Sequence, residues 1–218
     1  MKTTSAKTNM RAFTLIELLT IIVGIAVTLL FLLPMLARPT RCSCRLSCAN
    51  NLKQIGLSFR LFANDNGDRY PMAVSTNDGG SLEFVQTSHA FRHLQTLSNE
   101  LSTPKVIVCP QDSRSPAATN WWSTDLDNGK VSYFVGLAAE ESFPQMILAG
   151  DRNITTGYLS RNGTLWITTN RPVGWTAQIH TNAGNICFSD GSVQSFTAAG
   201  LQQHYSRSGL PATRLAVP

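Results

Sequence analysis

The residues of this chain best able to do chemistry are a few histidines, cysteines and carboxylates. In HTNAGNICFSDG, nine residues separate His180 from the pair Asp190-Gly191, so an imidazole and a carboxylate lie at the two ends of one short segment. Such a pair could act as acid and base or bind a metal ion. The alternative, which we expect, is that His180 only hydrogen-bonds to the neighbouring hairpin or loop.

The Asp190-Gly191 pair itself predicts a two-residue hairpin turn, because both residue types tolerate positive φ. Counting outward from that turn, Phe188 would face Val193 across the hairpin as a core-forming pair. This places the segment on two antiparallel strands.

Two other groups of potential ligands lack the spacing of known sites. His89 and His93 lie four residues apart in SHAFRHL without the glutamate of H-E-x-x-H, so we expect two solvated histidines. Cys42, Cys44 and Cys48 do not have zinc-ligand spacing, and no metal site is predicted. The sequence also contains no nucleophile elbow, phosphate-binding loop or dinucleotide fingerprint, so we do not expect an enzyme.

A calcium loop is an alternative for the acidic turn after residue 63. Asn64, Asn66 and Asp68 offer oxygens at alternate positions, but Arg69 stands where an EF-hand needs glycine and Ser75 where it needs glutamate. We therefore expect a turn that ends a helix, and no cofactor.

The N-terminal region contains a long apolar run with one carboxylate. The stretch 13–36 has Glu17 as its single charge and would make a helix of about 36 Å, which predicts a transmembrane helix. An ordinary signal peptide is the alternative, but its apolar core would be shorter. Because an ionised carboxylate in hydrocarbon costs roughly 2.5–3.5 kcal/mol, Glu17 needs a positively charged partner.

The charge distribution argues against a nucleic-acid binder. Residues 62–218 hold ten Lys and Arg against twelve Asp and Glu, a net charge of −2. The positive charges concentrate instead on both sides of the apolar run. Lys2, Lys7 and Arg11 precede the run, which favours a cytoplasmic N-terminus, while a second basic group follows it.

The segment RAFTLIE, residues 11–17, resembles the cleavage signal of type IV pilins and type II secretion pseudopilins. The resemblance implies a cut between Ala12 and Phe13, N-methylation of Phe13, and Glu17 as the fifth residue of the mature chain. The new amine would pair with Glu17 of its own helix or of a neighbouring subunit. The family usually has glycine where this chain has Ala12. Pro34 matches a proline that often kinks the pilin helix.

The resemblance extends over most of the chain. CANNLKQIGLSFRLFANDNGDRYP, KVIVCPQD, QMILAGDRN and the element from His180 to Gly191 are similar to a bacterial pseudopilin-like family labelled by H-x(9)-D-G. It implies an α+β, pilin-like lollipop, with a long N-terminal transmembrane helix packed on a small antiparallel-sheet head. The domains would be a leader (1–12), a transmembrane and assembly helix (13–36), a periplasmic continuation of that helix (37–64) and the head (65–218).

After the apolar run, an apolar stripe predicts a helix over 41–63, and a second helix is expected over 87–101 in the head. The stripe comprises Cys48, Leu52, Ile55, Phe59 and Phe62. Strands are predicted over 105–109, 131–136, 145–150, 164–168 and 186–196. If the head lies outside the cytoplasm, a disulfide between Cys48 and Cys109 would join stalk to head; buried free thiols are the alternative.

The resemblance implies a prepilin-like subunit of the bacterial inner membrane, with its head in the periplasm. Its partners would be a prepilin peptidase/methylase, an assembly ATPase platform, copies of itself and other pseudopilins. The product would be a type II secretion-style pseudopilus or a type IV pilus-like filament. One alternative is a helix-anchored periplasmic binding or adhesion protein that does not polymerise and uses Trp121, Trp122, Trp166 and Trp175. Another is an envelope enzyme that uses His180 and Asp190.

Overall fold

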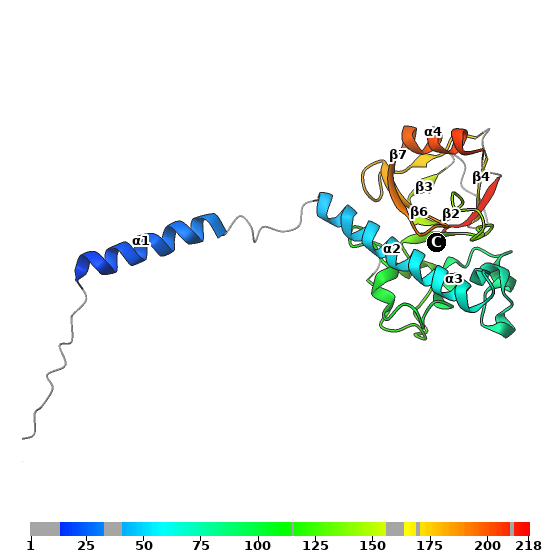
Figure 1. Cartoon of the computed structure of the whole chain (residues 1–218), viewed down its shortest axis with the longest axis horizontal. Helices are drawn as coiled ribbons and strands as arrows, with labels where there is room; N and C mark the ends of the chain where they lie inside the picture. The colour runs from blue at the N-terminus through cyan, green and yellow to red at the C-terminus, as the bar shows by residue number, and fades with distance from the viewer. Residues whose placement is uncertain (1–13, 33–40, 115, 156–163, 169–170, 210–211) are drawn as a thin grey trace, which may run out of the picture. The chain divides into compact units, whose positions relative to one another are not determined.

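The computed structural model describes residues 14–32, 41–114, 116–155, 164–168, 171–209 and 212–218 (Figure 1). The chain divides into two compact units, Met1–Pro39 and Thr40–Pro218. The predicted cleavage site at Ala12 and Phe13, and the predicted kink at Pro34, lie outside the described residues.

The first unit contains helix α1, Leu15–Leu32. Its start is fixed by a reciprocal cap: the Thr14 hydroxyl and backbone N–H donate to Glu17 Oε2 at 2.8 and 2.9 Å, and the Glu17 N–H donates back to Thr14 Oγ1 at 3.4 Å. This is the capping box expected of Thr-x-x-Glu. The backbone and side-chain bonds from Thr14 lower the pKa of Glu17, so the carboxylate is ionised at neutral pH.

The prediction of a membrane-spanning helix over 13–36 is wrong. Helix α1 has 18 residues. At the rise of an α-helix it extends over about 27 Å, whereas the hydrocarbon core is about 30 Å thick and takes about 20 residues to cross. No helix in the described parts of the chain combines the length and apolar character that crossing a membrane requires. The predicted location, a single-pass inner-membrane protein with a periplasmic head, is therefore contradicted as well.

The second unit is built on helix α2, Arg41–Asp65. The predicted apolar stripe is confirmed: Cys48, Leu52, Ile55 and Phe59 are fully buried. At Gly56, α2 comes so close to the sheet that a Cβ would lie 2.5 Å from the sulfur of Cys187. Helix α2 therefore packs directly on the sheet.

The sheet has six antiparallel strands in the order β4-β8-β1-β2-β6-β7. The strands are β1 (Tyr133–Gly136), β2 (Ile147–Asp151), β4 (Thr164–Ile167), β6 (Ala183–Phe188), β7 (Val193–Thr197) and β8 (Thr213–Ala216). A separate pair joins β3 (Ile154–Thr155) to β5 (Gly174–Trp175). The class is α+β, but the predicted pilin-like lollipop is wrong, because the N-terminal helix is short and no helix in the described residues is long and apolar enough to cross a membrane.

Both faces of this sheet are covered. Side chains alternate along a strand, so Tyr133 and Val135 of β1 join the core beneath α2 while Phe134 joins the core beneath α4, Ala198–Ser208. Figure 1 shows α2 and α3 (Ala90–Gln95) on one side of the sheet and α4 on the other. A buried polar residue on the α2 side is therefore enclosed between a helix and a sheet.

Several predicted elements differ from the structure. The helix expected over 87–101 is reduced to α3. The strand expected over 105–109 is a 3-10 turn at Pro104–Ile107, because a proline at the first position favours a helical start. The hairpin predicted within 186–196, by contrast, is present as the antiparallel strands β6 and β7.

Candidate functional site

The Asp190-Gly191 turn is a structural corner. The Gly191 N–H donates to the Phe188 carbonyl at 2.9 Å, and the Phe188 N–H donates to the Ser192 carbonyl at 2.9 Å. Three residues therefore form the loop, with Gly191 at φ +81°, instead of the predicted two. The cross-strand partner of Val193 is accordingly Cys187, not Phe188.

The carboxylate of Asp190 is used inside this corner. Its Oδ1 accepts a 2.8 Å hydrogen bond from the Ser192 N–H. The backbone carbonyls on either side of it are held from the α2 side: Arg60 donates to the Asp190 carbonyl at 3.2 Å, and Tyr70 donates to the Ser189 carbonyl at 2.8 Å. The described contacts of Asp190 are thus those of a turn residue.

His180 lies in a different environment, a buried polar cluster on the α2 side of the sheet. Its Nδ1 lies 2.8 Å from Gln111 Oε1, and its Nε2 lies 3.6 Å from Cys109 Sγ and 3.5 Å from Asp151 Oδ2. His180 does form a side-chain hydrogen bond, but its partner Gln111 is 69 residues away in sequence and does not belong to the hairpin or the loop beside it.

The backbone at His180 has an unusual conformation. His180, Thr181 and Asn182 have φ values of +57°, +53° and +59°, three consecutive left-handed residues of which none is glycine. Such conformations cost energy and persist only where the surroundings impose them. Here Asn153 imposes them, because its Nδ2 lies 2.7 Å from the Ile179 carbonyl and 3.1 Å from the Ala183 carbonyl.

Asp151 ends strand β2 inside the core, where it is fully buried. Its Oδ2 accepts from the backbone and side-chain nitrogens of Asn185 at 2.7 and 2.9 Å, whereas its Oδ1 has no hydrogen-bond partner among the described residues. Burial raises the pKa of Asp151 to about 7, an effect that the Asn185 bonds only partly offset. Burial also lowers the pKa of His180 to about 4, so the imidazole is uncharged at neutral pH.

The cysteines complete the cluster. Cys48 of α2 forms a disulfide with Cys109, the pair preferred from the sequence, and both are fully buried. Cys44 and Cys187 are free thiols. Burial raises the pKa of Cys187 to about 12, so it is an inert core residue. Nothing is described for the side chain of Cys42.

A buried ion pair borders the cluster. The Arg152 guanidinium contacts Asp112 twice, at 2.6 and 2.8 Å, and the Ser132 hydroxyl donates to the same carboxylate at 2.8 Å. Because Asp112 lies three residues after Cys109 and Arg152 directly after Asp151, this pair joins two of the four segments that supply the cluster.

The other candidate sites contain little chemistry. At the predicted calcium alternative, Asn66 Nδ2 donates to the Phe62 carbonyl at 2.8 Å, which makes it a helix-ending residue. The expectation of two solvated histidines is wrong for His93, which is buried with Nδ1 2.7 Å from Ser81 Oγ. Trp121 and Trp175 are buried, which removes two of the four tryptophans from any binding surface.

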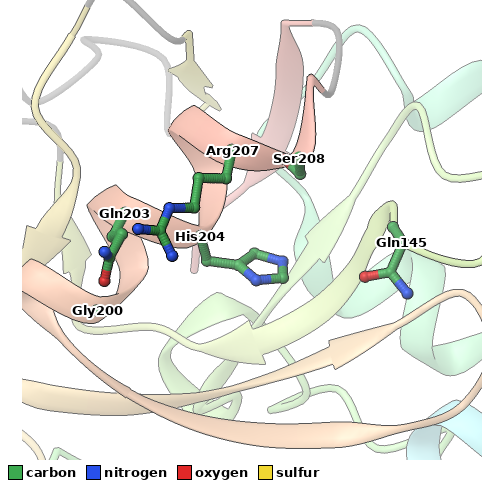
Figure 2. A pocket seen from close by; sticks show the side chains of 6 residues that line it. All are labelled: Gln145, Gly200, Gln203, His204, Arg207 and Ser208. Atoms are coloured by element: carbon green, nitrogen blue, oxygen red, sulfur yellow. The ribbon is translucent and has the colours of Figure 1, made fainter.

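A hollow of about 390 Å³ lies between α4 and the start of β2 (Figure 2). It is lined by Gln145, Gly200, Gln203, His204, Arg207 and Ser208. The His204 ring packs at a tilt, with its centroid 5.2 Å from those of Phe188 and Phe196, and its Nε2 is buried without a hydrogen-bond partner among the described residues. The hollow is polar and open, and the His180 cluster is the stronger candidate site.

Sequence reasoning singled out His180 but not its partners. Gln111, Asp151, Asn153 and Asn185 lie in segments that carry the family resemblance, but no spacing or motif indicates that their side chains form a site. One signal was present: Asp151 directly follows the apolar strand ILAG, a position where a carboxylate is buried with the strand end. Comparisons with known proteins add no relative, since no family profile, curated protein or solved structure matches this chain.

Proposed function

We propose that this chain is a pilin-like subunit, cut between Ala12 and Phe13 by a prepilin peptidase/methylase and assembled into a filament of the type II secretion pseudopilus or type IV pilus kind. Its partners would be copies of itself, other pseudopilins and an assembly ATPase platform. The proposal rests on the resemblance of residues 11–17 to the prepilin signal, together with one observation on α1.

That observation is the unpaired apolar surface of α1. Eleven large apolar side chains are exposed all round the helix: Leu15, Ile16, Leu18, Leu19, Ile21, Ile22, Val23, Ile25, Val27, Leu29 and Leu30. A helix that is apolar on every side is stable only when it is buried. In a filament, packing of α1 against the same helix of other copies would bury this apolar surface. The second unit has its own core and disulfide, so it would not need to unfold when α1 packs in this way.

Glu17 would then set the stagger between neighbouring helices. In the single chain its carboxylate caps α1 through Thr14. In a filament the same ionised carboxylate would accept a hydrogen bond from the methylated, positively charged amine of Phe13 of an adjacent subunit. This ion pair would give Glu17 the positively charged partner that it does not have among the described residues of the single chain.

The test begins with the N-terminus of the full chain coexpressed with a prepilin peptidase and assembly platform. The proposal expects a mature start at N-methylated Phe13 and filaments that contain the chain. A start at Met1, or one beyond Ala37, would remove it.

Two substitutions then separate the cap from the filament contact. Glu17→Gln keeps a capping-box side chain but removes the charge, so it should be processed normally and fail to form filaments. If Glu17→Gln assembles like the wild type and only Glu17→Ala fails, Glu17 is merely a helix cap. Glu140→Gln, an exposed carboxylate of the second unit, is the matched control and should assemble normally.

A further inference from the structure

Four electron-pair donors converge at the His180 cluster. Cys48 Sγ, Cys109 Sγ and His180 Nε2 all lie within 4.8 Å of one another. Asp151 adds a carboxylate oxygen 3.5 Å from the same ring nitrogen, and its second oxygen is buried without a partner among the described residues. These atoms come from α2, from the segment after the 3-10 turn, from β2 and from the loop before β6.

The hydrogen bonds of the cluster leave His180 Nε2 without a proton of its own. The Gln111 carboxamide oxygen can only accept, so its contact with His180 Nδ1, at 2.8 Å, places the imidazole proton on Nδ1. His180 Nε2 therefore directs a lone pair toward Cys109 Sγ and Asp151 Oδ2. A disulfide sulfur has no proton to offer it, and Asp151 Oδ2 already accepts two hydrogen bonds from Asn185. These facing atoms offer lone pairs, which suits a cation; the one positive charge that acts on both His180 and Asp151 among the described residues is that of Arg45, which a bound ion would have to tolerate.

Two of the distances around His180 Nε2 match those between ligands of a tetrahedral metal ion, whereas the two sulfurs would have to separate on reduction. With zinc–sulfur and zinc–nitrogen bonds of about 2.3 and 2.05 Å, a sulfur and a nitrogen on one ion lie about 3.6 Å apart, and an oxygen and a nitrogen about 3.4 Å apart. The structure has 3.6 Å from Cys109 Sγ to His180 Nε2 and 3.5 Å from that nitrogen to Asp151 Oδ2.

We propose that the reduced chain binds a thiophilic cation of the Zn²⁺ type through Cys48, Cys109 and His180, with Asp151 as the nearest fourth donor. Because the same two sulfurs form the disulfide, the chain would contain either the bound ion or the disulfide, but not both. Two thiolates and an imidazole are ligands that such ions select. Gln111 and Asn185 would be the supporting shell, since each holds a ligand or the fourth donor by a hydrogen bond.

A dithiol reductant gives two electrons and two protons to the Cys48–Cys109 bond, leaving two thiols and an oxidised dithiol. The cation then takes the place of the two thiol protons, which pass to solvent, and forms two metal–sulfur bonds and one metal–nitrogen bond. Both the disulfide and the bound ion would link α2, through Cys48, to the segment that contains Cys109. The inference does not depend on filament assembly.

The experiment uses the full chain with Cys42→Ser, Cys44→Ser and Cys187→Ala, so that Cys48 and Cys109 are the only cysteines. Because both are fully buried, the chain is unfolded with a dithiol and refolded without oxygen in the presence of Zn²⁺, or of Co²⁺ as a spectroscopic probe. Native mass spectrometry counts bound ions, and circular dichroism reports the fold. We expect one ion per reduced chain, none per oxidised chain, and a thiolate-to-cobalt absorption band that oxidation abolishes.

Substitutions identify the ligands. His180→Gln should weaken Zn²⁺ binding by about 100-fold or more, and Asp151→Asn by about tenfold. His204→Gln, on the opposite face of the sheet, is the matched control and should bind like the parent chain. The proposal is overturned if the folded, reduced chain binds no ion, if His180→Gln binds as tightly as the parent, or if the reduced chain folds only after oxidation.

Discussion

The phenolic hydroxyl of Tyr70 donates a 2.8 Å hydrogen bond to the backbone carbonyl of Ser189, a residue 119 positions later in the chain. The bond is buried and links the Tyr-Pro corner after α2 to the three-residue loop between β6 and β7. Phe59 supports it, because its ring meets the Tyr70 ring edge-on with centroids 5.8 Å apart.

Tyr70→Phe should lower the free energy of unfolding by about 1–2 kcal/mol, because it leaves a buried carbonyl without its donor. Amide hydrogen exchange should accelerate at Ser189, Asp190 and Gly191. Tyr205→Phe removes a bond to the Ile167 carbonyl on the other face of the sheet and should not change exchange in that loop. Unchanged exchange in Tyr70→Phe would show that the bond does not hold the loop.

Removal of the disulfide should be costly. Cys48 and Cys109 are 61 residues apart, and a cross-link over that distance stabilises a fold by about 4 kcal/mol in the chain-entropy account. The double variant Cys48→Ala/Cys109→Ala should lose about this much stability in urea under oxidising conditions. Cys44→Ser, which removes a free thiol, should unfold at the wild-type midpoint; an equal loss there would point to general thiol effects.

Thr181→Gly should stabilise the protein. A β-branched residue at φ +53° carries about 1–2 kcal/mol of backbone strain, and glycine removes it at an entropic cost of about 0.5–1 kcal/mol. We expect a net gain of up to about 1.5 kcal/mol in the free energy of unfolding. Ala199→Gly in α4 is the contrasting control, since glycine there should cost about 1 kcal/mol. A loss in both variants would mean that position 181 is unstrained.

Asp112 should give the protein an acid-sensitive component of stability. Burial raises the pKa of Asp112, but hydrogen bonds from Arg152 and Ser132 outweigh burial and lower it to about 2. Its pKa in the unfolded chain is about 3.9. The folded value is the lower one, so this stabilisation is complete above about pH 4 and is lost as pH falls toward 2.

Asp112→Asn should therefore lower the free energy of unfolding by about 3 kcal/mol at pH 7 by leaving Arg152 unpaired. The difference in the free energy of unfolding between the variant and the wild type should disappear as pH falls from about 4 to 2. Thermal unfolding across this range measures it, with the exposed Asp78→Asn as control. A gap that stays constant down to pH 2 would show that the carboxylate charge is not the stabilising feature.

Local patterns sufficed for the elements with strong periodicity. The four-and-three spacing of apolar residues identified α2 and its buried stripe, and the β-branched runs located β1, β2 and β4. Helix α4 was missed because its sequence, AAGLQQHYSRS, places only Leu201 and Tyr205 in the core. The N-terminal cap of this helix is also a weak sequence signal, because it consists of a single threonine. In the structure, Thr197 Oγ1 accepts one 3.2 Å hydrogen bond from the Gly200 N–H.

The site was harder to predict because its partners are distant in sequence. Cys109 and Gln111 meet His180 across 71 and 69 residues. That meeting depends on sheet order, in which β2 lies between β1 and β6. Spacing could place His180 near a hairpin, but it could not show that three consecutive left-handed residues direct its ring into the core. Asp190, by contrast, was interpretable from its own turn.

The position of Cys48 near the start of α2 determines how the second unit would bear a pull on its N-terminal side. Tension entering at the first residue of α2 crosses about two helical turns and then passes through the sulfur–sulfur bond to Cys109. The segment between the two cysteines, which are 61 positions apart, forms a covalent loop that carries no load. When such a chain is stretched, about 200 Å of contour length stays hidden until the bond is cut. The part of the apolar stripe of α2 that follows Cys48 lies within this covalent loop. A force applied at the start of α2 would therefore be transmitted through the disulfide without separating this part of the helix from the sheet.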